Sequence, residues 1–144
     1  MQPVIHKFYV DGSYSHKWGV GAFCIVSIIN DDKSYEVFDW DNVDSGTDPE
    51  VDGLAFTIAR AIKYRDKDVR CVVYTDSMAA IRCHKEYAAD FGIQLQHIKG
   101  HLLGRDDVVI NDHVKAHDWC DVMARLRVND NIRKVIAIAE DLYG

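Results

Sequence analysis

The sequence predicts an α/β fold: a mixed five-stranded sheet, with three antiparallel strands followed by two parallel ones, and helices packed on it. Two observations indicate this class. As far as Trp40, runs of β-branched and aromatic residues are separated by polar turns, which is typical of an antiparallel meander. From Pro49 onward, segments with helical periodicity alternate with short apolar runs, which is typical of strand–helix units with parallel strands.

The antiparallel part is expected to contain three strands. Val4–Val10 is rich in β-branched and aromatic residues and ends at the turn signal Asp11-Gly12-Ser13. Trp18–Ile29 is a nearly unbroken apolar run, which predicts a strand covered on both faces. Asn30-Asp31-Asp32 is expected to turn the chain, so that Ser34–Trp40 returns as the third strand.

A helix and two parallel strands are expected after the polar segment Asp41–Asp48. Pro49 is a favoured first-turn residue, and apolar residues then recur at helical spacing, at Val51, Leu54, Ala55, Ile58 and Ile62. Val69–Tyr74 and Ile93–Ile98 are predicted as strands four and five, joined by a helix over Met78–Ala89. Because helices connect them, both strands should run parallel to the first.

The last part of the chain is expected to be helical. A loop from Lys99 to about Asp112 precedes one helix near His113–Arg127 and a second helix that is capped around Asp130. Repeats, low-complexity segments and linkers are absent from the sequence. We therefore expect residues 1–144 to form a single domain.

Composition and charge restrict the function. Lys and Arg number 17 against 23 Asp and Glu, a net charge of −6, whereas a nucleic-acid-binding protein normally carries a basic surface. Two bound divalent cations would reduce this excess to −2. The four cysteines are widely spaced and contain no C-x-x-C pair, so we expect reduced thiols. Neither a signal peptide nor an apolar stretch of about 20 residues is visible, which favours the cytoplasm and no membrane contact.

Four carboxylates fall at positions suited to metal binding. Asp11 and Asp76 follow predicted strands, Glu50 opens a helix, and Asp121 lies within one. Phosphodiester hydrolysis with two divalent ions requires several carboxylates in one place, because hard cations such as Mg²⁺ prefer oxygen ligands.

Each acid also has a simpler interpretation. Asp11 and Asp76 could be turn or cap residues, with Asp76 or Ser77 capping the helix that follows. Thr47-x-x-Glu50 reads as a capping box, and Asp52 competes with Glu50 for the ligand role. Asp121 could be a solvated helix charge.

Taken together, these residues resemble the type 1 ribonuclease H family. The resembling segments occur in the family's order over nearly the whole chain, and comprise Tyr9-Val10-Asp11-Gly12-Ser13, Glu50 before an alanine-rich helix, Tyr74-Thr75-Asp76-Ser77, Ile98-Lys99-Gly100-His101 and Cys120-Asp121-Val122-Met123-Ala124-Arg125. The resemblance implies a ribonuclease H-like fold and a metal-dependent endonuclease. Such an enzyme cuts the RNA strand of RNA–DNA hybrids and leaves 5′-phosphate and 3′-hydroxyl ends.

The resemblance also implies residue roles and a cofactor. Two Mg²⁺ ions, or Mn²⁺ as a substitute, would be held by Asp11 between them, by Glu50 and Asp76 on the water side, and by Asp121 at the other site. His101 would move protons toward the leaving group, since its pKa is near neutral. Substrate would be contacted by Gly12, Ser13 and Ser77, and the protein is expected to act as a monomer.

The sequence departs from the family in three places. Only one helix, which is not basic, separates strands four and five, so Arg105 in the following loop is a candidate phosphate contact. The segment between His101 and Asp121 is long, and residues 102–110 could pack on the core or dock a protein partner. His117 stands where the family often has asparagine.

Two other functions remain open. His113, His117 and Asp121 share one helix face and could hold a zinc ion for hydrolysis. The chain could also be an inactive ribonuclease H-like binding module that contacts a partner through residues 102–110.

Overall fold

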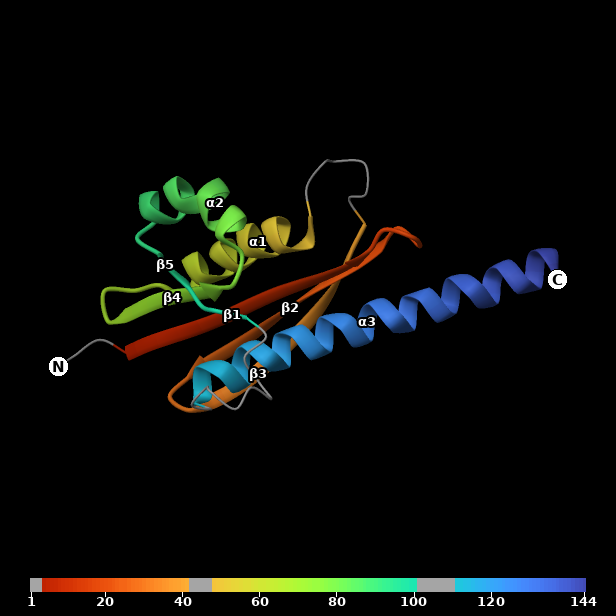
Figure 1. The fold of residues 1–144 in the computed structure, drawn as a ribbon. Helices are drawn as coiled ribbons and strands as arrows, with labels where there is room; N and C mark the ends of the chain where they lie inside the picture. Colours follow the sequence, from red (N-terminus) through yellow and green to blue (C-terminus); the bar gives the residue numbers. More distant parts are fainter. Residues whose placement is uncertain (1–3, 42–47, 101–110) are drawn as a thin grey trace.

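The computed structural model describes residues 4–41, 48–100 and 111–144. Their elements follow in the order β1 (Val4–Ser15), β2 (Val20–Ile29), β3 (Asp32–Trp40), α1 (Pro49–Tyr64), β4 (Val69–Thr75), α2 (Met78–Asp90), β5 (Gln94–His97) and α3 (Asp112–Tyr143). The strands form one five-stranded sheet in the order β3-β2-β1-β4-β5. This arrangement confirms the predicted fold class (Figure 1).

Strand directions are those predicted: β1, β2 and β3 pair antiparallel, whereas β4 pairs parallel to β1 and β5 parallel to β4. Asn30 and Asp31 connect β2 to β3, with φ angles of 49° and 66°. Two successive residues with positive φ are typical of a type I′ turn, whose twist matches that of the flanking strands. The Asn-Asp-Asp signal thus fixes the register of this hairpin.

The predicted end of the first strand was wrong. β1 continues to Ser15 instead of stopping at Val10, because β2 is long enough to pair with the additional residues, from Asp11 opposite Cys24 to Ser15 opposite Val20. The pairing of β1 with β4 ends earlier, at Tyr9 opposite Tyr74. Asp11 is therefore held inside a hairpin, just beyond the last residue that β4 pairs.

Helices cover both faces of the sheet (Figure 1). One core lies beneath α1 and α2 and includes Phe8 and Val10 of β1. The other lies beneath α3 and includes Tyr9, with the buried α3 residues Cys120 and Ala124. Because side chains alternate along a strand, Asp11 lies on the α3 side with Tyr9.

A single helix, α3, replaces the two helices predicted at the end of the chain. The sequence has neither glycine nor proline between Asp112 and Tyr143, and Asp130 is accommodated within the helix, 3.1 Å from Lys134 in an i,i+4 ion pair. An isolated aspartate lowers helix propensity only modestly, so it does not end a helix. In the part of the chain that the structure describes, no helix is both long and apolar enough to cross a bilayer.

His6, in β1, is a buried histidine whose pKa depends on the packing around it. Its side chain is buried, stacks on Phe8 with 4.2 Å between ring centroids, and its Nε2 lies 2.6 Å from Ser27 Oγ. Its Nδ1 is buried without a hydrogen-bond partner, and burial lowers the pKa of His6 from the ordinary 6.5.

We expect the free energy of unfolding to fall as the pH drops below about 6.5, because the unfolded chain then takes up a proton that folded His6 resists. Chemical denaturation between pH 8 and pH 5 measures this dependence. His6→Gln should flatten it, since glutamine does not titrate. Parallel profiles for the parent and the variant would show that His6 is not the source.

Candidate metal centre

Acidic side chains from three elements meet at one edge of the sheet. Asp11 comes from β1, Glu50 from the first turn of α1, and Asp76 from the residue after β4. β1 and β4 are parallel neighbours, so their carboxyl ends lie at the same edge, which is where such sheets place their sites. On the other side of the sheet, α3 adds His117 and Asp121.

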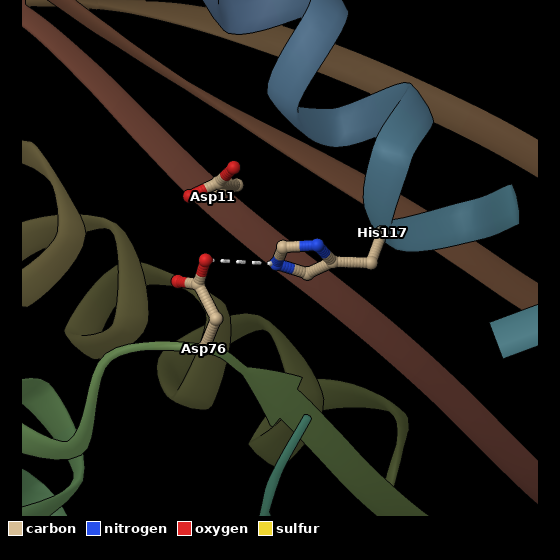
Figure 2. A group of neighbouring side chains, drawn as sticks. All are labelled: Asp11, Asp76 and His117. Atoms are coloured by element: carbon tan, nitrogen blue, oxygen red, sulfur yellow. Dashed lines mark ion pairs between the residues drawn. The ribbon is translucent and has the colours of Figure 1, made fainter. Parts of the chain in front are cut away.

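Asp11, Asp76 and His117 form the most compact part of this site. One ligand atom from each lies within 4.8 Å of the others, and the described residues contain no other such group of histidine, cysteine and acidic side chains. His117 Nε2 is 3.6 Å from Asp76 Oδ2. Figure 2 shows the imidazole ring of His117 extending from α3 to Asp76, with the carboxylate of Asp11 next to that of Asp76.

Glu50 lies beside this compact group without being part of it. Its half-buried carboxyl interacts electrostatically with those of Asp11 and Asp76. Gly12 makes this approach of α1 to β1 possible, since a Cβ there would lie 2.8 Å from Glu50 N and 2.9 Å from the Pro49 carbonyl carbon. Any larger residue at position 12 would push the start of α1, and Glu50 with it, away from Asp11.

The alternative interpretation of Glu50 as half of a capping box is not borne out. Asp48 is the cap of α1, and its Oδ1 accepts a hydrogen bond of 2.8 Å from Val51 N. Thr47 lies outside the described residues. Asp52, the competing acid, is directed to Trp40, whose Nε1 donates to Asp52 Oδ2 at 2.6 Å.

Crowding of the carboxyl groups changes their acidity. Burial raises the pKa of Asp11, and the charge of Asp76, the hydrogen bond with Glu50 and the charges of Glu50 and Asp121 raise it further. Burial also raises the pKa of Glu50. A divalent cation would reverse this trend, because it stabilises the ionised carboxylates that now repel one another. The residues present therefore suit a divalent metal ion.

Asp121 lies beside the compact group. Its charge contributes to the raised pKa of Asp11, yet its Oδ2 pairs with Arg125 Nη2 at 3.2 Å, one helical turn further along α3. The side chain is mostly buried. Asp121 is thus near Asp11 but outside the compact group of Asp11, Asp76 and His117, and its carboxylate is paired with Arg125.

Glycine and serine residues border the site. A Cβ on Gly100 would clash with Asp76 Oδ2, so a larger residue there would displace this carboxylate. The Ser77 hydroxyl caps α2 by accepting from Ala80 N at 3.1 Å. Ser13 lines a surface cleft next to Glu50, together with Gly12, Tyr14, His16, Asp48 and Pro49. Substrate contacts by Gly12, Ser13 and Ser77 stay predictions.

Two predicted site residues, His101 and Arg105, lie outside the described residues, as does the loop 102–110. The zinc-binding stripe on α3 does not assemble in the described residues. His113 Nδ1 is hydrogen bonded to the Tyr9 hydroxyl, and His113 does not join the group formed by Asp11, Asp76 and His117.

His117 is the residue whose position the sequence did not reveal. The sequence places His117 where the resembled family often has asparagine and on one helix face with His113 and Asp121, and it does not link His117 to Asp11 or Asp76. The available signal was its i−4 spacing from Asp121, which places both on the same face of a helix.

Comparison with known proteins supports the fold. No family profile and no curated protein matches the sequence. Among solved structures, the solution structure of the PFV RNase H domain is similar with a TM-score of 0.55 and 12% identity, covering 90% of this chain and 96% of that domain. At this identity the likeness shows a ribonuclease H-like fold.

The electrostatic crowding predicts that Asp11→Asn stabilises the metal-free protein. Unfolded Asp11 ionises near the ordinary pKa of 3.8, but the folded protein resists ionisation. Stability is therefore lost as the pH rises above about 4 toward the raised pKa of the folded state.

Asparagine removes this loss, and each pKa unit that it removes corresponds to about 1.4 kcal/mol. Melting at pH 7.5 with EDTA should give a higher midpoint for Asp11→Asn than for the parent. Saturating Mn²⁺ should raise the parent's midpoint more than the variant's. A variant that melts below the parent in EDTA would contradict the crowding.

Proposed function

We propose that this protein is a divalent-metal-dependent endonuclease that hydrolyses the RNA strand of RNA–DNA hybrids, leaving 5′-phosphate and 3′-hydroxyl ends. The observation that carries this proposal is the meeting of Asp11, Glu50 and Asp76 at the carboxyl edge of the parallel strands. A ribonuclease H-like fold with these acids at that edge supports phosphodiester hydrolysis over the other functions considered.

The roles proposed for the acids follow from their positions. Asp11 is the innermost and interacts with each of the other three, so it would serve both cation positions. Glu50 and Asp76 would hold the ion on one side, and Asp121 the ion on the other. We propose two Mg²⁺ ions, with Mn²⁺ as a substitute. When bound, such a pair of ions supplies an activated water and charge stabilisation for the leaving oxygen.

Substrate would approach over the exposed side of the acidic group. The cleft beside Glu50, lined by Ser13, Tyr14 and His16, extends the site along β1. Backbone and hydroxyl groups of Gly12, Ser13 and Ser77 would contact that strand, Arg105 would contact a phosphate, and His101 would carry protons. Selection of RNA would depend on the 2′-hydroxyl group.

Arg125 would allow a cation to bind reversibly at Asp121. Its guanidinium neutralises the carboxylate at 3.2 Å, and more than half of the side chain is exposed. Arg125 is therefore able to move into solvent when a cation arrives, so that the Asp121 carboxylate has a positive partner in both states.

An RNA–DNA hybrid with a labelled RNA strand tests the proposed activity. Purified protein should cleave it in Mg²⁺ or Mn²⁺ and not in EDTA, and it should spare the DNA strand and double-stranded DNA. Asp11→Asn should reduce the rate by about 100-fold or more, a barrier increase of roughly 2.7 kcal/mol. Intact hybrid with either metal, or a variant within about tenfold of the parent, would refute the proposal or the role of Asp11.

Glu50 and Asp52 form a matched pair of acids in the same turn of α1. Glu50→Gln should abolish most cleavage with little change in the melting temperature, since its carboxyl faces Asp11 and Asp76. Asp52→Asn should keep cleavage, because Asp52 contacts Trp40. Both rates and both melting curves are measured on the same hybrid. The reverse order of rates would mean that the ligand role belongs to Asp52.

A further inference from the structure

We infer that His117 is a nitrogen ligand of the metal centre, and that it makes this position select first-row transition ions such as Mn²⁺ or Co²⁺ over Mg²⁺. The inference rests on the proposed function in one respect, because it assigns His117 to the same metal centre. It adds a ligand that the carboxylates alone do not imply, and at this one position it reverses the order of preference between Mg²⁺ and Mn²⁺ given above.

The position of His117 supports a ligand role. The residue is 3% exposed and reaches the acids from α3, on the side of the sheet opposite α1. Its Nε2 is 3.6 Å from Asp76 Oδ2, and a ligand atom of Asp11 lies within 4.8 Å of both residues. Two ligands that share one ion at about 2.1 Å are separated by roughly 3–4 Å, so only small movements would bring all three into one coordination sphere.

A structural role alone explains this geometry less well. A histidine that serves only to fill the core needs apolar neighbours and one polar partner, as His6 has with Phe8 and Ser27. His117 instead faces Asp76, with Asp11 close by (Figure 2). Imidazole is the commonest metal ligand among side chains, and here it lies beside two carboxylates that could share the same ion.

The composition of the ligand set determines which ion it prefers. Mg²⁺ binds oxygen ligands in a near-ideal octahedron and gives up water reluctantly. Imidazole suits the borderline transition ions, and affinity for nitrogen-containing sites rises from Mn²⁺ through Co²⁺. Asp11 and Asp76 supply two negative charges when ionised, which balance one divalent ion, and a neutral His117 adds a donor without adding charge.

Two measurements on the metal-loaded protein test the inference without relying on activity. Pulsed electron paramagnetic resonance of the protein with one equivalent of Mn²⁺ detects a directly bound imidazole through its ¹⁴N coupling. Calorimetric titration with Mn²⁺ and with Mg²⁺ gives the affinity ratio. The variants are His117→Gln, which offers an amide at a similar reach, and the control His113→Gln, which alters a histidine on the same helix that bonds to Tyr9.

We expect ¹⁴N coupling in the parent and in His113→Gln, and its loss in His117→Gln. We also expect His117→Gln to weaken Mn²⁺ binding by roughly 10–100-fold, because in metalloproteins even a change to a residue that only supports a ligand typically has this effect. Mg²⁺ binding should weaken much less. Absence of ¹⁴N coupling in the parent would overturn the inference, and this readout does not depend on whether the variants fold. Equal losses in both variants would overturn it in favour of the α3 stripe.

Failure of the inference and failure of the proposed function give different results. Cleavage of the hybrid with an unchanged Mn²⁺-to-Mg²⁺ ratio in His117→Gln would overturn the role of His117 alone. Mn²⁺ binding with ¹⁴N coupling but no cleavage would support the role of His117 and refute the nuclease. A parent that binds neither ion would overturn both.

Discussion

Repulsion between buried carboxylates is the constraint on which the rest of this structure depends. Burial opposes the ionisation of Asp11 and of Glu50, and the charge of Asp76 opposes it further, so a bound cation would stabilise their anionic forms. Bringing these carboxyl groups together therefore costs free energy on folding, and the packing of the surrounding strands and helices has to offset that cost. Such strain is common at functional sites, where pKa values are shifted by burial and by like charges.

The two cores supply that compensation by holding β1 from both sides. Phe8 and Val10 are packed beneath α1, while Tyr9 contacts α3, and the buried Cys120 Sγ donates to the Tyr9 carbonyl oxygen at 3.2 Å. The alternation of side chains along β1 thereby links the position of each helix to the same short stretch of chain. Asp11 follows directly, so both helices present their polar residues to it.

Room for the site comes from two glycines. Gly12 lets the backbone of α1 approach β1, and Gly100 lets the chain cross above Asp76. In both places even a methyl group would contact backbone or carboxylate atoms at less than 3 Å. Gly12 and Gly100, which belong to the motifs that resemble ribonuclease H, therefore contribute by having no side chain where other atoms come close.

Most of the sheet could be predicted from the sequence, because its strands are apolar runs bounded by strong turn signals such as Asn30-Asp31. The end of β1 could not, since Asp11-Gly12-Ser13 reads locally as a turn and only pairing with β2 keeps it extended. The helix end predicted near Asp130 was wrong for a related reason. A cap residue alone does not end a helix whose first half is already packed on the sheet. Among the site residues, the meeting of Asp11, Glu50 and Asp76 follows from strand order, but His117 depends on the rotation of α3 about its axis, which the sequence does not fix.

The length of α3 has a consequence for the dynamics of the molecule. Its first half is anchored by Val114, Cys120 and Ala124, whereas after Val128 its side chains are exposed or only partly buried, and Figure 1 shows this end extending away from the sheet. Asn131 Nδ2 still donates to Asp39 Oδ1 of β3 at 2.9 Å, but the turns that follow approach an isolated helix, which at about 12–15 residues is only marginally stable in water. The helix therefore contains two zones of different stability, and amide hydrogens near Leu142 will exchange with solvent through local fraying long before those near Cys120. His117 and Asp121 lie in the slowly exchanging zone, so the carboxyl-terminal turns can unwind and re-form without disturbing them.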